Sequence, residues 1–311
     1  MTSDARQRLQ LVLAFAIVYI VWGSTYLAIR IGVTDLPPAL LAGARNTSAG
    51  LALMLFAWHR TGMAPWRSPD WKIAVPVGLA MIALANGFTT WGEDWVPSNQ
   101  AALISVCSAL FTAWFGTFGP RGHALSTRAK VGLGTGFIGA LLLLMPGHGF
   151  SFQHLGAQLL IFIATAAWAG GAMWGRHKQP TTPPLMLASM QMLTGGVVLL
   201  ILGFASGEAS QWQWTFKGVG AVVYLAVFGS ILSYTTYIWL VRKVTPDKLS
   251  TIAYVNPLVA VILGWVVLGE TLNGWQVAGM FVLLGGVVLI NTPARSLVKS
   301  IFKRKKGSAT A

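Results

Sequence analysis

Apolar stretches long enough to cross a membrane follow one another along almost the whole chain. A helix of ~20 apolar residues spans the hydrocarbon core of a bilayer. Ten such stretches are predicted, at 9–30, 37–58, 72–92, 97–118, 128–146, 155–176, 183–205, 217–240, 247–268 and 274–292. With 55% hydrophobic and only 10% charged residues, the chain has too little charge to cover a soluble surface of this size. We therefore predict an all-α membrane protein with ten transmembrane helices and short loops.

The sequence also contains two copies of one unit. Residues 21–50 match residues 167–196 without a gap, at an offset of 146. This match places Trp22 on Trp168 and a double proline in each copy. A second region, beginning at Val96, matches a later one at an offset of 148. A repeat of this length predicts that each copy is one structural unit of the fold.

Each copy contains five predicted spans, an odd number, so the second copy must cross the membrane in the opposite direction from the first. Inverted repeats of this kind build many secondary transporters, which bind substrate between the two halves near the middle of the membrane. We expect two inverted five-helix repeats around a central cavity. The expected parts are residues 1–149 and 150–293, followed by a basic cytoplasmic tail at 294–311.

Positive charge is concentrated on one side of the predicted membrane. Of the 22 lysines and arginines, all except Arg30, Arg45 and Lys217 lie in the terminal segments or at the loops that follow even-numbered spans. Because basic residues favour the cytoplasmic side, we predict that both termini are cytoplasmic. The net charge of +14 then belongs to loops beside anionic lipid. We expect the lipid bilayer, and no nucleic acid, as a partner.

Two stripes of polar residues mark the interior of the predicted bundle. Polar side chains inside a span are costly in hydrocarbon, so they usually face other helices or a wet cavity. On the eighth span, Ser230, Tyr234 and Tyr237 share one helical face. Asn86 and Thr90 form a shorter stripe on the third span, and Asn86 pairs with Tyr234 at an offset of 148. We predict that the two stripes face each other across the cavity.

Polar and aromatic residues of other spans extend these stripes into a predicted substrate-lining set. The set is Trp22, Thr25, Asn86, Thr90, Ser108, Trp168, Ser230, Tyr234, Tyr237 and Asn256. Each hydroxyl or amide either contacts substrate or bonds a neighbouring helix, which contributes about 1 kcal/mol or less in membranes. Each tryptophan either stacks on substrate or only packs in the bundle.

Two further residues inside spans have open roles. Pro257 leaves a carbonyl of its helix without the usual partner, which produces either a hinge or a static kink. Arg45 lies about two turns into the second span, where it either bonds neighbouring helices or extends toward the surface. Its functional alternative is attraction of an anionic substrate group such as a carboxylate.

Acidic residues and histidines are predicted only at helix ends and in loops. The spans therefore offer no evident proton relay and no catalytic constellation, and we expect neither an enzyme, nor a metal site, nor a cofactor. Energy coupling either uses an end-positioned acid such as Glu93 or Asp94, or transport runs downhill.

Several motifs resemble those of the EamA-type ten-helix exporters in the drug/metabolite transporter superfamily. They are VWGSTYLAIR at 21–30 with the double proline that follows, Arg45, and YVNPLVAVILGWVVLGE at 254–270 before a glycine-rich last span. The first half departs from this pattern. Where the second half has Asn256–Pro257 and Gly269–Glu270, the first has Ser108–Ala109 and Pro120–Arg121–Gly122.

The resemblance implies a multi-pass exporter of the bacterial inner membrane. Known branches of the family move amino acids, including aromatic ones, or drugs and other small metabolites. A lining of hydroxyls, amides and aromatic rings, with Arg45 as the one deep cation, suits a small zwitterion or an uncharged amphiphile. We expect export of amino acids by alternating access, and export of drugs or other small metabolites is the alternative. The oligomeric state stays open.

Overall fold

The structure is a computed structural model, which describes residues 3–118, 124–145, 152–241, 243–244, 248 and 251–291. Within these ranges the chain forms helices and no strand. The first half contains α1 (Ser3–Gly32), α2 (Pro38–Thr61), η1 (Pro65–Arg67), α3 (Trp71–Gly78), η2 (Leu79–Asn86), α4 (Gly87–Glu93), α5 (Ser98–Ser105), α6 (Cys107–Phe115) and α7 (Thr127–Leu143). The second contains α8 (Phe152–Lys178), α9 (Pro184–Ala205), η3 (Glu208–Gln211), α10 (Phe216–Tyr224), η4 (Leu225–Leu232), α11 (Ser233–Val241), α13 (Ile252–Leu268) and α14 (Gly274–Asn291).

Seven helices in the described part are long and apolar enough to cross a membrane, and Val255–Leu268 is apolar but shorter. These eight helices coincide with eight of the ten predicted spans. The predicted span 97–118 is divided at Val106 into α5 and α6, and the span 128–146 corresponds to α7, which has 17 residues. The all-α membrane fold is thus confirmed. The predicted tail at 294–311 and the Pro120–Gly122 segment lie outside the described residues.

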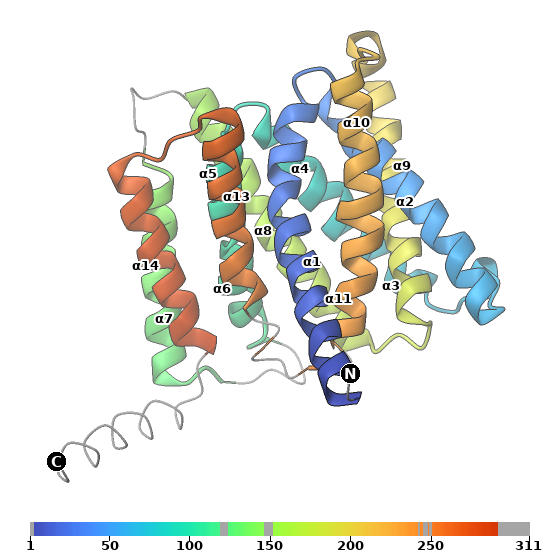
Figure 1. Cartoon of the computed structure of the whole chain (residues 1–311). Coiled ribbons are helices and arrows are strands. Elements are labelled where there is room, and N and C mark those ends of the chain that lie inside the picture. Colours follow the sequence, from blue (N-terminus) through green and yellow to red (C-terminus); the bar gives the residue numbers. More distant parts are fainter. Residues whose placement is uncertain are drawn as a thin grey trace.

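Corresponding helices of the two halves pack against each other in pairs. Figure 1 shows α7 beside α14 at one edge of the bundle and α2 near α9 at the opposite edge, and both pairs are in extensive contact. Glycines allow the closest approach. A Cβ on Gly139 would lie 2.3 Å from the backbone nitrogen of Leu283, and one on Gly286 would lie 2.5 Å from that of Gly136. Because no side chain fits there, these helices meet backbone to backbone.

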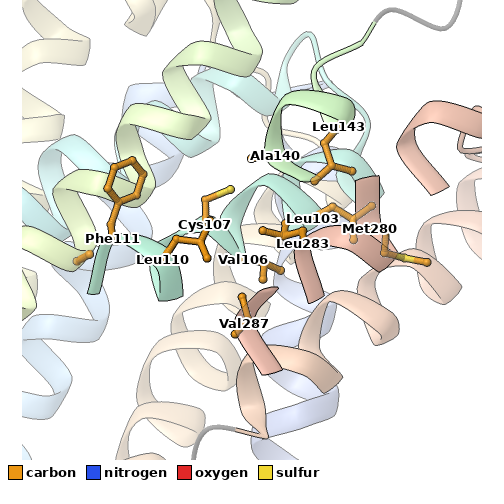
Figure 2. Packing of buried hydrophobic residues seen from close by; sticks show 11 residues of the cluster. Leu103, Val106, Cys107, Leu110, Phe111, Ala140, Leu143, Met280, Leu283 and Val287 are labelled. Atoms are coloured by element: carbon orange, nitrogen blue, oxygen red, sulfur yellow. The ribbon is translucent and has the colours of Figure 1, made fainter. Parts of the chain in front are cut away.

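The core beside this pair is built from aliphatic side chains of four helices. Leu103, Leu110 and Leu143 of the first half are fully buried against Leu283 and Val287 of α14. Figure 2 shows these side chains converging between α5, α6, α7 and α14. This apolar core packs the two halves together through close contact of aliphatic side chains.

The third helix of each half is widened into a π-helix along part of its length. Each segment has eight residues, and both ends of η4 lie 146 residues after those of η2. At this offset Leu232, and not Tyr234, is the counterpart of Asn86. The widened turns leave carbonyls without their usual partners, and side chains fill the gap. Asn86 Nδ2 donates to the Met81 carbonyl (3.0 Å), and Ser233 Oγ donates to that of Phe228 (2.9 Å).

Candidate functional site

A group of polar and aromatic side chains joins α1 and α2 to the η4–α11 helix. We call Trp22, Thr25, Arg45, Ser230 and Tyr237 the Trp22–Arg45 group. The Nε of Arg45, a residue only 9% exposed, donates to Ser230 Oγ at 3.1 Å. The Trp22 indole Nε1 donates to the carbonyl of Gly229 at 3.0 Å. The sequence predicted four of these residues as substrate-lining, and the structure brings them together.

Trp22, Thr25 and Arg45 all approach η4 at Gly229. Trp22 and Tyr237 have ring centroids 5.2 Å apart at an interplanar angle of 43°. A Cβ on Gly229 would lie 3.0 Å from Cγ2 of Thr25 and 3.4 Å from Nη2 of Arg45. The glycine therefore lets α1 and Arg45 approach η4 closely. Thr25 Oγ1 itself donates to the Trp22 carbonyl at 2.6 Å, so its hydroxyl supports its own helix.

The predicted stripe on the third helix uses its polar atoms within that helix. Thr90 Oγ1 donates to the Asn86 carbonyl at 2.8 Å, and the Asn86 amide is taken up by the π-helical turn. Tyr234 packs with Ile82 of η2 and Leu53 of α2. The two stripes are thus adjacent, but no hydrogen bond joins them among the described residues.

Three further predicted lining residues belong to other helices. Trp168, the repeat partner of Trp22, is 36% exposed on α8, and Ser108 lies half-buried on α6. On α13, the Oδ1 atom of Asn256 is buried without a hydrogen-bond partner in the described part of the chain. The helix continues through Pro257 to Leu268, so the proline does not end it. Whether Pro257 acts as a hinge stays a prediction.

A buried acid lies at the end of α4. Glu93 is 0% exposed, and both of its carboxylate oxygens are buried without a hydrogen-bond partner among the residues described. Arg30 Nη1 instead donates to the backbone carbonyls of Glu93 (2.5 Å) and Asp94 (2.8 Å). Neither Arg30 nor Arg45 donates to the carboxylate, since their assigned hydrogen bonds go to backbone carbonyls and to Ser230. The sequence indicated Glu93, together with Asp94, as an acid at a helix end that is a candidate for energy coupling.

The two halves of the chain match one and the same family model. The model is that of the EamA-like transporter family, and it matches residues 9–145 and again residues 155–292. The chain belongs to the EamA-like transporter family. It is therefore a membrane transporter, and each matched segment covers one of the predicted repeats.

Relatives of this transporter match along nearly its whole length. It is 37% identical over 306 residues to a protein of Escherichia coli K12 named as the uncharacterized inner membrane transporter YedA, covering 96% of this chain and 97% of the relative. It is 26% identical over 291 residues to the uncharacterized transporter YvbV of Bacillus subtilis 168, covering 94% of each chain. A solved crystal structure with 20% identity has the same fold, at a TM-score of 0.65 over 92% of this chain and 97% of that one.

Two acids of this EamA-like transporter, Glu270 and Glu208, cap helices from distant parts of the chain, and a third, Asp70, bonds the segment that leads into α9. The helices α2, α5 and α9 each follow a proline, which offers no side-chain acceptor to the first backbone N–H groups. Glu270 accepts from Ser98 N (2.8 Å), Ser98 Oγ (2.8 Å) and Asn99 N (2.9 Å) at the start of α5. A proline before each helix is therefore a sequence signal that the first backbone N–H groups need an acceptor from another part of the chain.

Two acids, Glu208 and Asp70, join the halves reciprocally. Glu208 of the second half accepts from Leu40 N (3.0 Å) at the start of α2. Asp70 of the first half accepts from the backbone N of Thr181 (2.8 Å) and Thr182 (2.7 Å), just before α9. Burial would raise the pKa of Asp70, but the hydrogen bonds from Thr182 and Thr181 outweigh it and hold the pKa below its ordinary value. Each half thus fixes the other at a helix start or just before one.

Proposed function

We propose that this transporter exports amino acids by alternating access between its two halves, with the substrate bound at the Trp22–Arg45 group. The observation that carries the proposal is the buried guanidinium of Arg45, held against Ser230 beside the ring pair of Trp22 and Tyr237. A single oriented cation suits a carboxylate, and the rings suit a compact apolar or aromatic body. A polyphosphate would require more positive charge than one arginine provides.

The proposed location is the inner membrane of a bacterium, with both termini in the cytoplasm. The name of the Escherichia coli relative, an inner membrane transporter, supports the location. The asymmetry of lysines and arginines supports the orientation. A reporter fused to the C-terminus should be active in the cytoplasm, and activity only in the periplasm would contradict this orientation.

Uptake by proteoliposomes tests the substrate. Purified protein is reconstituted, and uptake of labelled aromatic, small polar and charged amino acids is measured separately. We expect saturable uptake of at least one class. Trp22→Phe removes the indole donor to Gly229, and we expect KM to rise about fivefold, the equivalent of one hydrogen bond of about 1 kcal/mol. The matched control is Trp168→Phe at the repeat-related position outside the group, which should change KM less than about twofold.

Export of drugs or other small metabolites is the second candidate. The exposed faces of tilted aromatic rings also attract organic cations, and Trp22 with Tyr237 offers such a pair. Accumulation of a hydrophobic cation by the same proteoliposomes, without uptake of any amino acid, would favour this candidate. Competition between the cation and an amino acid would instead indicate one shared site.

A further inference from the structure

Glu93 differs from the other well-placed acids of the molecule. Glu208 and Glu270 accept hydrogen bonds from backbone N–H groups at helix starts, and Asp70 accepts them from the two residues before the N-cap of α9. The Glu93 carboxylate has no such donor, although the side chain is 0% exposed. A carboxylate removed from water without a hydrogen bond or an ion pair costs several kcal/mol or more. A hydrogen-bond donor, a positive charge or a bound proton must therefore offset the cost of burying Glu93.

The groups that surround Glu93 do not supply a donor. From α1, Arg30 uses its Nη1 on backbone carbonyls, and the Tyr26 hydroxyl is hydrogen-bonded to the Ser105 side chain. From α2, Arg45 directs its Nε to Ser230. The remaining charged neighbour, Glu270 in the loop after α13, carries the same sign as Glu93 and disfavours a second negative charge.

The helices packed closest to the end of α4 contribute neutral groups at this level. A Cβ on Gly92 would lie 2.4 Å from Cγ1 of Ile161 and 3.0 Å from the carbonyl of Ala157, so α8 seals this side. On α5, both polar side-chain atoms of Asn99 are buried and unpartnered in the part of the chain described. Among the residues that the structure describes, no side chain from these directions donates a hydrogen bond to the Glu93 carboxylate.

We propose that Glu93 binds a proton in this conformation and is the group that couples transport to protons. The coupling part of this inference rests on the proposed transport function, whereas the proton binding does not. The proton comes from water and adds to one carboxylate oxygen, which converts a buried anion into a neutral acid. No other bond is made or broken.

Contacts around Glu93 link the proton to conformational change. Arg30 ties α1 to the end of α4, and Glu270 ties the loop after α13 to the start of α5. In the predicted topology all of these lie toward the outer side. When the helices separate there, water reaches Glu93 and the acid ionises. The closed arrangement therefore holds the proton, and the open one releases it.

Infrared spectroscopy tests the proton directly and needs no substrate. The full-length protein in lipid nanodiscs at neutral pH should show a carbonyl-stretch band of a protonated carboxylic acid, with the shift expected in heavy water. Glu93→Gln, which has the same shape, should abolish the band. Glu208→Gln is the matched control and should retain it. Absence of the band from the wild type, or its persistence in Glu93→Gln, overturns the proposal. If Glu93→Gln yields no folded protein, the band should shift in Glu93→Asp. An unshifted band in Glu93→Asp would likewise overturn the proposal.

Accumulation under a proton gradient tests the coupling. With an amino acid that the wild type transports, a gradient of one pH unit should change the accumulation ratio about tenfold for one coupled proton. Glu93→Gln should equilibrate the same amino acid without accumulation. Accumulation by Glu93→Gln comparable to that of the wild type overturns the coupling. A Glu93-dependent band in a protein that moves no amino acid refutes the proposed function and leaves the proton site in place.

Discussion

Arg45 of α2 donates a hydrogen bond to the hydroxyl of Ser230 on η4, across 3.1 Å and between residues 185 positions apart in the chain. The bond joins the two halves of the transporter at the point where η4 is widened into a π-helix. The extra residue of a π-helical turn rotates the side chains that follow it, and such segments often occur at functional sites. The pair is thus both a contact between the halves and part of the proposed substrate site.

Removing the Ser230 hydroxyl should destabilise the protein measurably. Ser230→Ala leaves Arg45 Nε without its acceptor in a buried position, and we expect a loss of about 1 kcal/mol in the free energy of unfolding. Thermal unfolding in detergent measures this as a lower Tm. Ser48→Ala on α2 is the control, because Ser48 is exposed and bonds only carbonyls of its own helix. Equal Tm values for the two variants would contradict the importance of the pair.

Closing the space between α7 and α14 should be far more costly than changing a nearby glycine. Gly139→Ala places a Cβ 2.3 Å from the Leu283 nitrogen, and we expect a loss of about 1–3 kcal/mol from overpacking. Gly134→Ala on the same helix meets nothing within 4 Å. Its higher helix propensity should stabilise the protein by up to about 1 kcal/mol. A lower Tm for Gly139→Ala together with a higher Tm for Gly134→Ala would support the backbone contact. An equal Tm for the two variants would contradict it.

The cap on α5 should depend on the carboxylate of Glu270. Glu270→Gln replaces one acceptor oxygen by an amide that cannot accept from Ser98 or Asn99, and we expect a loss of about 1–2 kcal/mol. Asp94→Asn is a control, because Asp94 is exposed and engages Arg30 through its backbone carbonyl. A Tm for Glu270→Gln within error of that for Asp94→Asn would argue against the cap. Hydrogen exchange of the first amides of α5 should also increase in Glu270→Gln alone.

Acid should weaken the contact between Asp70 and the segment before α9. Because the folded-state pKa of Asp70 is lowered by its hydrogen bonds, the stability that it contributes is present above the unfolded pKa of about 3.9. That contribution is lost as the pH falls through the lower folded pKa. We expect Tm to fall below pH ~4 in the wild type and to fall less steeply there in Asp70→Asn. Parallel pH profiles for the two proteins would show that Asp70 does not contribute.

The candidate site was only partly predictable from the sequence. Helical spacing grouped Ser230 and Tyr237 on one face, and the repeat marked Trp22 as a residue of interest. The same repeat also marked Trp168, which lies outside the Trp22–Arg45 group, because related positions in two halves need not have related neighbours. Arg45 was found as a buried charge, but its partner was not, since a helical period carries no information about which helix lies opposite.

The sequence by itself determined the membrane class, the succession of helices and the presence of two related halves. These properties depend on apolarity over ~20 consecutive residues and on similarity along the chain, so no contact between distant residues is needed to infer them. The tertiary structure decided that Glu93 is buried without a donor in the part of the chain described, that Glu208 caps α2 of the other half, and that Asp70 bonds the segment before α9. Burial and capping depend on how helices pack, because each polar group at a helix end takes whichever partner the neighbouring backbone brings within reach.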